Sequence, residues 1–313
     1  NVNQEAKILL NYGVFNYEHA KYEEAIKLYE RAEIIFKGLG NKKDHGLVLT
    51  NLGETYLAIC EYQSCYNSLT ESRKIFEKIN NNVELNEALL LLGKFYWIVG
   101  NEAELNIIIK KLNEINKENS GLDSTQFSFM TRIAKVTKDF NQKNIDEILK
   151  IIQQSKTINQ KVIAIDIQFI LINILLENNI IEGIHELVLD TEMLKFCKNN
   201  PHYEAKRLLI LYKLSRVVGD ESIGTPIDHL QKGLEIMESE SITEETISIL
   251  FNFSQYYHDR GNLKKATEYG DLYFEILEYI INNLKTDGIK DFYLKNNRVK
   301  NYLNNYKNLK DQK

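Results

Sequence analysis

A glycine returns at a fixed interval in the first third of the chain. Gly13, Gly53 and Gly93 are 40 residues apart, and each follows a tyrosine or a leucine. Intervals of this length are typical of stacked structural repeats, in which one unit is too small to bury its apolar face alone. The sequence therefore predicts a fold built by repetition, in which neighbouring units form one continuous core.

The first unit contains two segments with apolar and small residues at helical spacing, residues 3–19 and 22–38. A glycine inside a helix costs about 1 kcal/mol relative to alanine, so its repeated use needs a packing reason. Gly13 and Ala25 would lie where the two helices cross, and small side chains there let the axes approach closely. The side chains expected to fill the flanking grooves are Tyr12, Tyr17, Tyr22 and Tyr29. Each unit is thus predicted to be an antiparallel pair of helices.

Several other residues keep the same register as the glycines. They are the pairs Leu52-Gly53 and Leu92-Gly93, the tyrosines Tyr56 and Tyr96, the turns Gly100-Asn101 and Gly261-Asn262, and the alanines Ala25 and Ala266. This pattern resembles the tetratricopeptide repeat (TPR) family, although each unit here carries about a turn and a half more helix. The resemblance implies a right-handed α-solenoid whose first helices line a concave groove that binds a peptide or protein segment.

The rest of the chain suits the same architecture. It holds only 2 prolines and 15 glycines in 313 residues, so little interrupts a helix and an all-α fold is expected. About seven TPR-like helix pairs are expected over residues 1–285, with a weaker pattern between residues 125 and 240. In the fifth pair, Gly183 is expected in the small position of the second helix.

Residues 286–313 are expected to form a separate C-terminal segment, with a single amphipathic helix over residues 289–309. Its apolar stripe consists of Val299, Tyr302, Leu303, Tyr306 and Leu309. The end of a solenoid leaves apolar surface uncovered, so this helix is predicted to cap the last repeat. Alternatively, it leads into a further domain or forms a homodimer through its stripe.

Candidate binding residues follow from the resemblance, because the first helix of each pair would line the groove. Asn11, Asn51 and Asn252 occupy the same position in three units. An asparagine amide can donate to and accept from one peptide unit, so a ladder of them suits an extended peptide. Alternatively, these asparagines cap neighbouring turns. The other expected groove residues are Lys7, Leu10, Val14, Tyr17, Leu47, Thr50, Glu54, Leu57, Leu90, Lys94, Trp97, Phe251, Gln255 and His258.

Basic residues gather in the predicted inner face of the middle units. They are Arg132, Lys135, Lys138, Lys206, Lys213 and Arg216. A positive groove in an acidic protein favours an acidic segment or a carboxylate terminus as ligand, and the alternative is a solvated helix face. Trp97 beside Lys94 is either an anchor for a partner or a core residue. Tyr17, Asn11, Asn51, Glu54, Lys94, Trp97, Arg132, Lys135, Asn252 and Gln255 are the predicted peptide-binding residues.

Motifs for catalysis or cofactor binding are not found. The chain has neither of the glycine-rich phosphate-binding fingerprints and no Gly-x-Ser-x-Gly elbow. Glu182 and His185 form one Glu-x-x-His, as in di-iron bundles, but a second copy is missing. We therefore expect a non-enzymatic protein with no catalytic residue, no metal and no cofactor.

Charge and hydropathy limit which classes of partner and which cellular compartment are expected. The formal net charge of −5 argues against nucleic acid, since nucleic-acid-binding domains are usually basic. The longest apolar run, residues 163–176, is too short to span a bilayer, so no membrane partner is expected. Cys60, Cys65 and Cys197 form no paired framework and are expected to be buried, reduced thiols, which suits a cytoplasmic protein. Because the first residue is Asn1, we suspect a piece of a longer protein.

The leading hypothesis is a peptide- or protein-binding module whose groove holds an extended or acidic segment, as part of a larger regulatory protein. Bacterial peptide-pheromone receptors, which have similar long repeats and asparagine ladders, are one version of it. A second hypothesis is the regulatory segment of a signalling enzyme, such as a kinase, cyclase or ATPase, with catalysis outside this chain. A third is an oligomeric structural adaptor.

Overall fold

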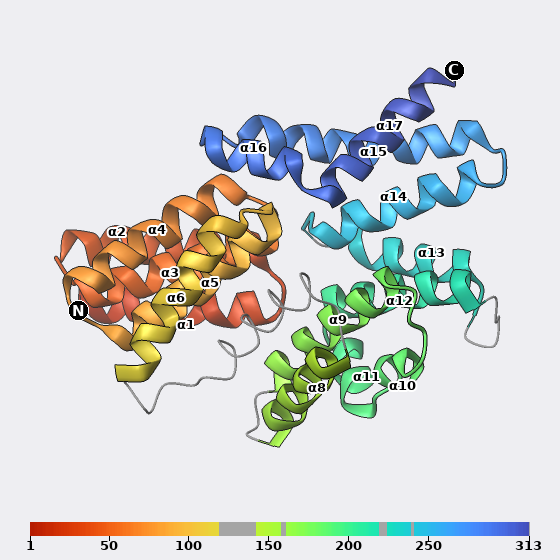
Figure 1. Ribbon diagram of the computed structural model, residues 1–313. Coiled ribbons are helices and arrows are strands. Elements are labelled where there is room, and N and C mark those ends of the chain that lie inside the picture. Colours follow the sequence, from red (N-terminus) through yellow and green to blue (C-terminus); the bar gives the residue numbers. More distant parts are fainter. Residues whose placement is uncertain (119–141, 158–160, 219–223, 239–240, 313) are drawn as a thin grey trace. The chain divides into compact units, whose positions relative to one another are not determined.

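The computed structural model describes residues 1–118, 142–157, 161–218, 224–238 and 241–312 (Figure 1). Within these ranges every regular element is a helix. The chain divides into two compact units, of which unit 1 comprises Asn1–Leu122 and Glu240–Lys313, and unit 2 comprises Asp123–Ser239. The fold is an all-α solenoid of helix pairs, as the sequence predicts.

Unit 1 contains the regular repeats. Its helices are α1 (Val2–Glu18), α2 (Tyr22–Gly38), α3 (Lys42–Ala58), α4 (Tyr62–Lys78), α5 (Asn82–Val99), α6 (Glu102–Glu118), α14 (Glu244–His258), α15 (Leu263–Asn283), α16 (Asp287–Lys295) and α17 (Asn297–Asp311). Consecutive helices pack as pairs: α1 with α2, α3 with α4, α5 with α6, and α14 with α15. The predicted helix pair of the first unit is therefore confirmed almost to the residue.

The turns explain why the period is so regular. A residue with positive φ follows each of the first five helices, and these residues lie 20 positions apart, at Ala20, Gly40, Cys60, Asn80 and Gly100. The next backbone N–H then donates into the last helical turn, as Lys21 does to the Asn16 carbonyl at 2.9 Å. Two such half-repeats make the 40-residue period.

The small residues lie where first and second helices are in closest contact. A Cβ atom on Gly13 would run into the ring of Tyr29, and one on Gly53 would lie 2.5 Å from Leu69 Cδ2. Both Tyr29 and Leu69 are buried. The predicted packing role of these glycines is thus confirmed, because any side chain there would push the two helices apart.

Tyr12 does not fill a groove, and that expectation is wrong. Its side chain is 55% exposed and its ring stacks on Phe15, with ring centroids 6.1 Å apart. Leu52, at the equivalent position of α3, is buried because α2 packs on that side of α3. On the corresponding side of α1 no described helix packs, which leaves Tyr12 uncovered.

Unit 2 is less regular. Its helices are α8 (Gln142–Thr157), α9 (Lys161–Glu177), α10 (Ile184–Val188), α11 (Thr191–Lys198), α12 (Pro201–Val218) and α13 (Pro226–Met237). Two short helices, α10 and α11, stand where one second helix is expected, and Asp190 caps α11 by accepting from the Met193 N–H at 3.0 Å. Gly183 precedes α10 with φ of 78°, and a Cβ there would meet nothing within 4 Å. The expectation that Gly183 is a small packing residue is therefore wrong, since it serves a turn.

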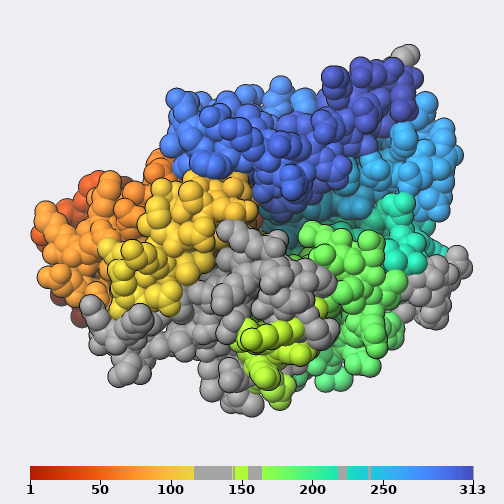
Figure 2. Space-filling model, viewed as in Figure 1, coloured from red at the N-terminus to blue at the C-terminus, as the bar shows by residue number. Residues whose placement is uncertain are grey.

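The C-terminal segment forms two helices rather than the single helix expected over residues 289–309. The helix is interrupted at Asn296, between α16 and α17. The Asn296 side chain accepts from the Arg298 N–H at 2.9 Å and donates to the Ile98 carbonyl at 3.1 Å. After the break, α17 packs on α15 and meets α14, where the Tyr302 and Ser248 hydroxyls lie 3.0 Å apart. Helices α15, α16 and α17 form one continuous blue surface in Figure 2.

Helix α17 caps the last repeat of unit 1, as predicted. Val299, Tyr302 and Leu309 are buried within the single chain. Leu309 lies over Gly270 of α15, where a Cβ would be only 3.0 Å from Leu309 Cδ1. The apolar stripe of this helix was the alternative contact for a homodimer, and it is largely covered by this chain's own helices.

Candidate functional site: the first-helix face of unit 1

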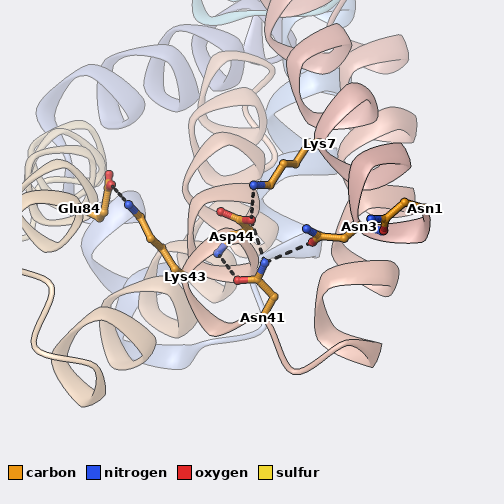
Figure 3. Close-up of polar contacts among 7 residues, drawn as sticks. All are labelled: Asn1, Asn3, Lys7, Asn41, Lys43, Asp44 and Glu84. Atoms are coloured by element: carbon orange, nitrogen blue, oxygen red, sulfur yellow. Dashed lines mark hydrogen bonds and ion pairs between the residues drawn. The ribbon is translucent and has the colours of Figure 1, made fainter.

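The first helices of three repeats lie side by side in unit 1 and are joined by polar contacts near their N-terminal ends (Figure 3). Lys7 Nζ of α1 lies 3.8 Å from Asp44 Oδ2 of α3. Lys43 Nζ of α3 lies 3.5 Å from Glu84 Oε1 of α5. These ion pairs are partly exposed, so each adds little stability.

Asn41 reinforces the same junction. Its side-chain oxygen accepts from the Asp44 N–H at 3.2 Å and so caps α3. Its amide nitrogen donates to Asp44 Oδ2 at 2.8 Å and to Asn3 Oδ1 at 3.4 Å (Figure 3). Lys7, expected to face a ligand, thus belongs to a structural junction between α1 and α3.

Beyond this junction, residues at equivalent positions of α1, α3 and α5 form what we call the first-helix face. It consists of Asn11, Asn51, Glu54, Glu87 and Lys94. All five side chains are exposed or half-buried. Four of them were predicted to bind a ligand. Glu87 was missed, although its position 40 residues after Leu47 could have identified it.

The asparagines of the chain differ in what their amides do. Among the described residues, neither the Asn11 nor the Asn51 side chain has a hydrogen-bond partner. In contrast, the Asn16 amide donates to the Tyr12 carbonyl at 2.7 Å, and the Asn252 amide donates to the Ser248 carbonyl at 2.7 Å. Asn11 and Asn51 therefore hold donors and acceptors that are open to an incoming group, whereas Asn252 already binds its own helix.

The charged residues of this face are the carboxylates Glu54 and Glu87 and the ammonium group of Lys94. The pKa of Glu87 is raised, first by burial and then by repulsion from Glu54 and Glu84. A cationic group bound nearby would stabilise the ionised carboxylate of Glu87.

The asparagine position is not kept in the third repeat. At this position α5 has Leu91, so the asparagines of the first-helix face are Asn11 on α1 and Asn51 on α3.

The other predicted residues of these helices have varied surroundings. Tyr17 is half-buried and packs on Tyr22, with ring centroids 5.5 Å apart. Trp97 is 36% exposed. Thr50 was expected to face a ligand, but it is buried with its hydroxyl 2.7 Å from Ser72 Oγ. The expectation for Thr50 is wrong because its position on α3 points to α4.

On α14, the expected groove positions are partly taken by the C-terminal cap. The Phe251 ring packs on Tyr273 and Tyr302, at centroid distances of 5.6 and 4.7 Å. His258 Nε2 lies 3.2 Å from Gln312 Oε1. Phe251 meets α17 and His258 meets its C-cap residue Gln312, because α17 packs on α15 and contacts α14. Gln255 remains half-buried.

Of the predicted basic residues, Arg132, Lys135 and Lys138 lie outside the described residues. The other three are on α12 of unit 2, and each has a neighbour. Lys213 Nζ donates to Asn173 Oδ1 at 3.0 Å, and Arg216 donates to the Tyr212 hydroxyl at 3.1 Å. Lys206 Nζ lies 4.8 Å from the ring centre of Tyr203. These contacts hold the basic side chains against α9 and α12.

Reactive chemistry is not evident in the described parts of the chain. No group of three or more histidine, cysteine or acidic residues there could hold a metal ion. The free thiols of Cys60, Cys65 and Cys197 are buried, as expected, and burial raises the pKa of each, which keeps them protonated. None of the described helices combines the length and the apolar character needed to cross a bilayer.

Comparisons with known proteins agree with a helical repeat. No family model matches the chain. An 88-residue stretch is 25% identical to the Tonsoku-like protein of Drosophila melanogaster, and it spans 28% of this chain and 6% of that protein.

Two solved structures share the fold. The Rap conjugation gene regulator of the plasmid pLS20, in complex with the Phr* peptide, aligns with a TM-score of 0.67 and 16% identity over 88% of this chain and 74% of that chain. NprR in complex with its cognate peptide NprX aligns with a TM-score of 0.57 and 13% identity over 96% of this chain and 88% of that chain. These likenesses show a common helical repeat fold.

Proposed function

We propose that the chain is a non-enzymatic peptide-binding module and that the first-helix face of unit 1 lines its binding groove. The observation that carries this proposal is the pair of open amides on Asn11 and Asn51, at equivalent positions of adjacent helices. The two solved structures described above each contain a bound peptide, which supports the same role here.

The chemistry of the two amides suits the backbone of an extended ligand. An asparagine side chain can donate to a peptide carbonyl and accept from a peptide N–H at the same time. Such contacts ignore the ligand's side chains, so they give affinity without sequence preference. Asn252 already uses one amide N–H on the Ser248 carbonyl, so fewer of its donors are open to a ligand than at Asn11 and Asn51.

Charged residues would then select the ligand's sequence. Glu54 and Glu87 on the first-helix face favour a basic residue, since a cation would relieve the repulsion that raises the pKa of Glu87. The basic residues of α12 in unit 2 independently favour acidic residues in a ligand. Tyr17, Lys94, Trp97 and Gln255 would supply side-chain contacts. A module of this kind is typical of a larger regulatory protein.

The proposal is tested by selecting peptides from a phage-displayed random library on the wild-type protein. The affinity of each enriched peptide is then measured for wild type and for the double variant Asn11→Ala, Asn51→Ala. We expect the double variant to lose about tenfold or more, because each neutral hydrogen bond contributes about 1 kcal/mol. Its melting temperature should stay that of wild type.

A matched control is Asn113→Ala, which removes an exposed asparagine from the second helix α6. It should leave both affinity and melting temperature unchanged. Failure to enrich any peptide would count against the proposal, as would peptides that bind the double variant as tightly as wild type. A fall in melting temperature with unchanged binding would assign the two asparagines to structure.

A further inference from the structure

Unit 2 contains an open cavity of about 480 Å³ between α8, α9 and the short helix α10. Its apolar wall includes Leu149, Leu171, Leu175 and Leu187. The cavity follows from the divided second helix described above, because α10 has only five residues and covers less of α9 than a full helix would. Volumes of this size are typical of sites that enclose a small organic molecule.

One polar group in the wall lacks a partner. The Gln168 side chain is 1% exposed, and its amide nitrogen donates to the Leu187 carbonyl at 2.8 Å. Its oxygen Oε1 is buried and has no hydrogen-bond partner among the described residues. A buried acceptor left unsatisfied costs about 1–3 kcal/mol, so this amide points to a ligand that donates a hydrogen bond.

Carboxylates line the same cavity on the side of α10. Glu182 and Glu186 are exposed, and neither forms an ion pair with another described residue. Asp190 also lines the cavity and caps α11. Charges of one sign around a cavity with apolar walls concentrate their potential inside it. This potential favours a cation.

We propose that this cavity binds a small organic amine, with a protonated amino group that donates to Gln168 Oε1 and an apolar body against the leucines. The carboxylates of Glu182 and Glu186 stabilise the positive charge, and an anionic or purely hydrocarbon ligand would leave both features unused. The volume exceeds what a single lysine side chain needs, so the site suits a whole small molecule.

The test compares three probes of equal length by isothermal titration calorimetry on the full chain. Hexylamine should bind, hexanol should bind at least about tenfold more weakly because it lacks the charge, and hexanoate should not bind. Equal affinities for hexylamine and hexanol would overturn the proposal, as would the absence of any heat with hexylamine. Tighter binding of a capped lysine than of hexylamine would overturn the assignment to a small molecule and favour the lysine side chain of a peptide.

Two variants locate the site. Gln168→Leu removes the acceptor together with the amide N–H that donates to the Leu187 carbonyl, and the double variant Glu182→Gln, Glu186→Gln removes the charge. Each should weaken hexylamine about tenfold, since a hydrogen bond to a charged group contributes more than a neutral one. Glu235→Gln on α13, an exposed carboxylate outside the cavity, is the matched control and should not change affinity.

Circular dichroism checks that each variant is folded. Unchanged hexylamine affinity in folded Gln168→Leu would show that the amine binds elsewhere. None of these residues belongs to the first-helix face, so the outcome is independent of the peptide-binding proposal.

Discussion

The first three repeats and unit 2 use the same building principle with different regularity. In α1 to α4, every helix has 17 residues and is followed two positions later by a positive-φ residue, so equivalent positions return every 40 residues. In unit 2 the second helix of one pair is divided into α10 and α11. The regular part therefore presents a repeated face with open amides, whereas the irregular part contains an open cavity. Regular turn spacing thus gives helices of equal length and a repeated surface, whereas a divided helix leaves space for a cavity.

The strongest test of the regular part is Gly53→Leu. A Cβ at this position would lie 2.5 Å from Leu69 Cδ2, so a leucine must push α3 away from α4. We expect a loss of about 3 kcal/mol in the free energy of unfolding, measured by urea denaturation. Gly38→Ala, where a Cβ meets nothing within 4 Å, is the control and should cause no loss. A stable Gly53→Leu variant would mean that the helices are not in close contact.

A second variant tests whether the two ends of the chain form one unit. Glu244 of α14 accepts hydrogen bonds from the Tyr62 hydroxyl of α4 and from Arg298 of α17, the latter at 3.1 Å. Glu244→Ala should cost about 2 kcal/mol, because it leaves both donors without this acceptor. Hydrogen exchange should then speed up in α4 and α17 together.

The control for this variant is Glu278→Ala, an exposed carboxylate of α15. It should leave exchange unchanged throughout unit 1. If Glu244→Ala accelerates exchange only in α14, then the N-terminal repeats and the C-terminal helices are separate bodies.

The turns offer a smaller and opposite effect. Ala20 has φ of 60°, a conformation that costs a non-glycine residue about 1–2 kcal/mol. Ala20→Gly should therefore stabilise the protein by about 1 kcal/mol or less, since glycine also gains entropy in the unfolded chain. Gly40→Ala, with φ of 67°, should destabilise it by a similar amount. Equal melting temperatures for all three proteins would contradict the expected cost of a non-glycine residue at these turns.

The smallest expected effect concerns the carboxylates of the first-helix face. The folded-state pKa of Glu87 is raised above its ordinary value of 4.5, so ionising Glu87 at neutral pH opposes folding. Glu87→Gln should raise the melting temperature slightly at pH 7. The gain should shrink as the pH falls through the raised pKa, and it should vanish below 4.5, where Glu87 is protonated in both states. A gain that is constant with pH would rule out this electrostatic cause.

The helix pairs of unit 1 could be predicted because several independent signals agree there. Glycines mark the helix contacts, and asparagines such as Asn41 follow a residue with positive φ and cap the next helix. Each signal is local, so the sequence alone carries it. The same register also located the face that holds Asn11 and Asn51.

Other features depend on contacts between distant residues and could not be read from the sequence. The break at Asn296 is stabilised by the Ile98 carbonyl, nearly 200 positions earlier in the chain. Phe251 looked accessible because nothing in the local pattern shows that α17 covers α14. Gly183 fits either a close helix contact or a turn, and only its positive φ distinguishes them.

The central claim is that the amides of Asn11 and Asn51 are free to bind a peptide backbone. The most direct measurement is a nuclear magnetic resonance titration that follows side-chain amide signals while a library-selected peptide is added. We predict that the Asn11 and Asn51 signals shift together and that the Asn16 signal, whose amide is held by the Tyr12 carbonyl, stays in place. Saturating peptide that leaves the Asn11 and Asn51 signals unmoved would contradict the claim.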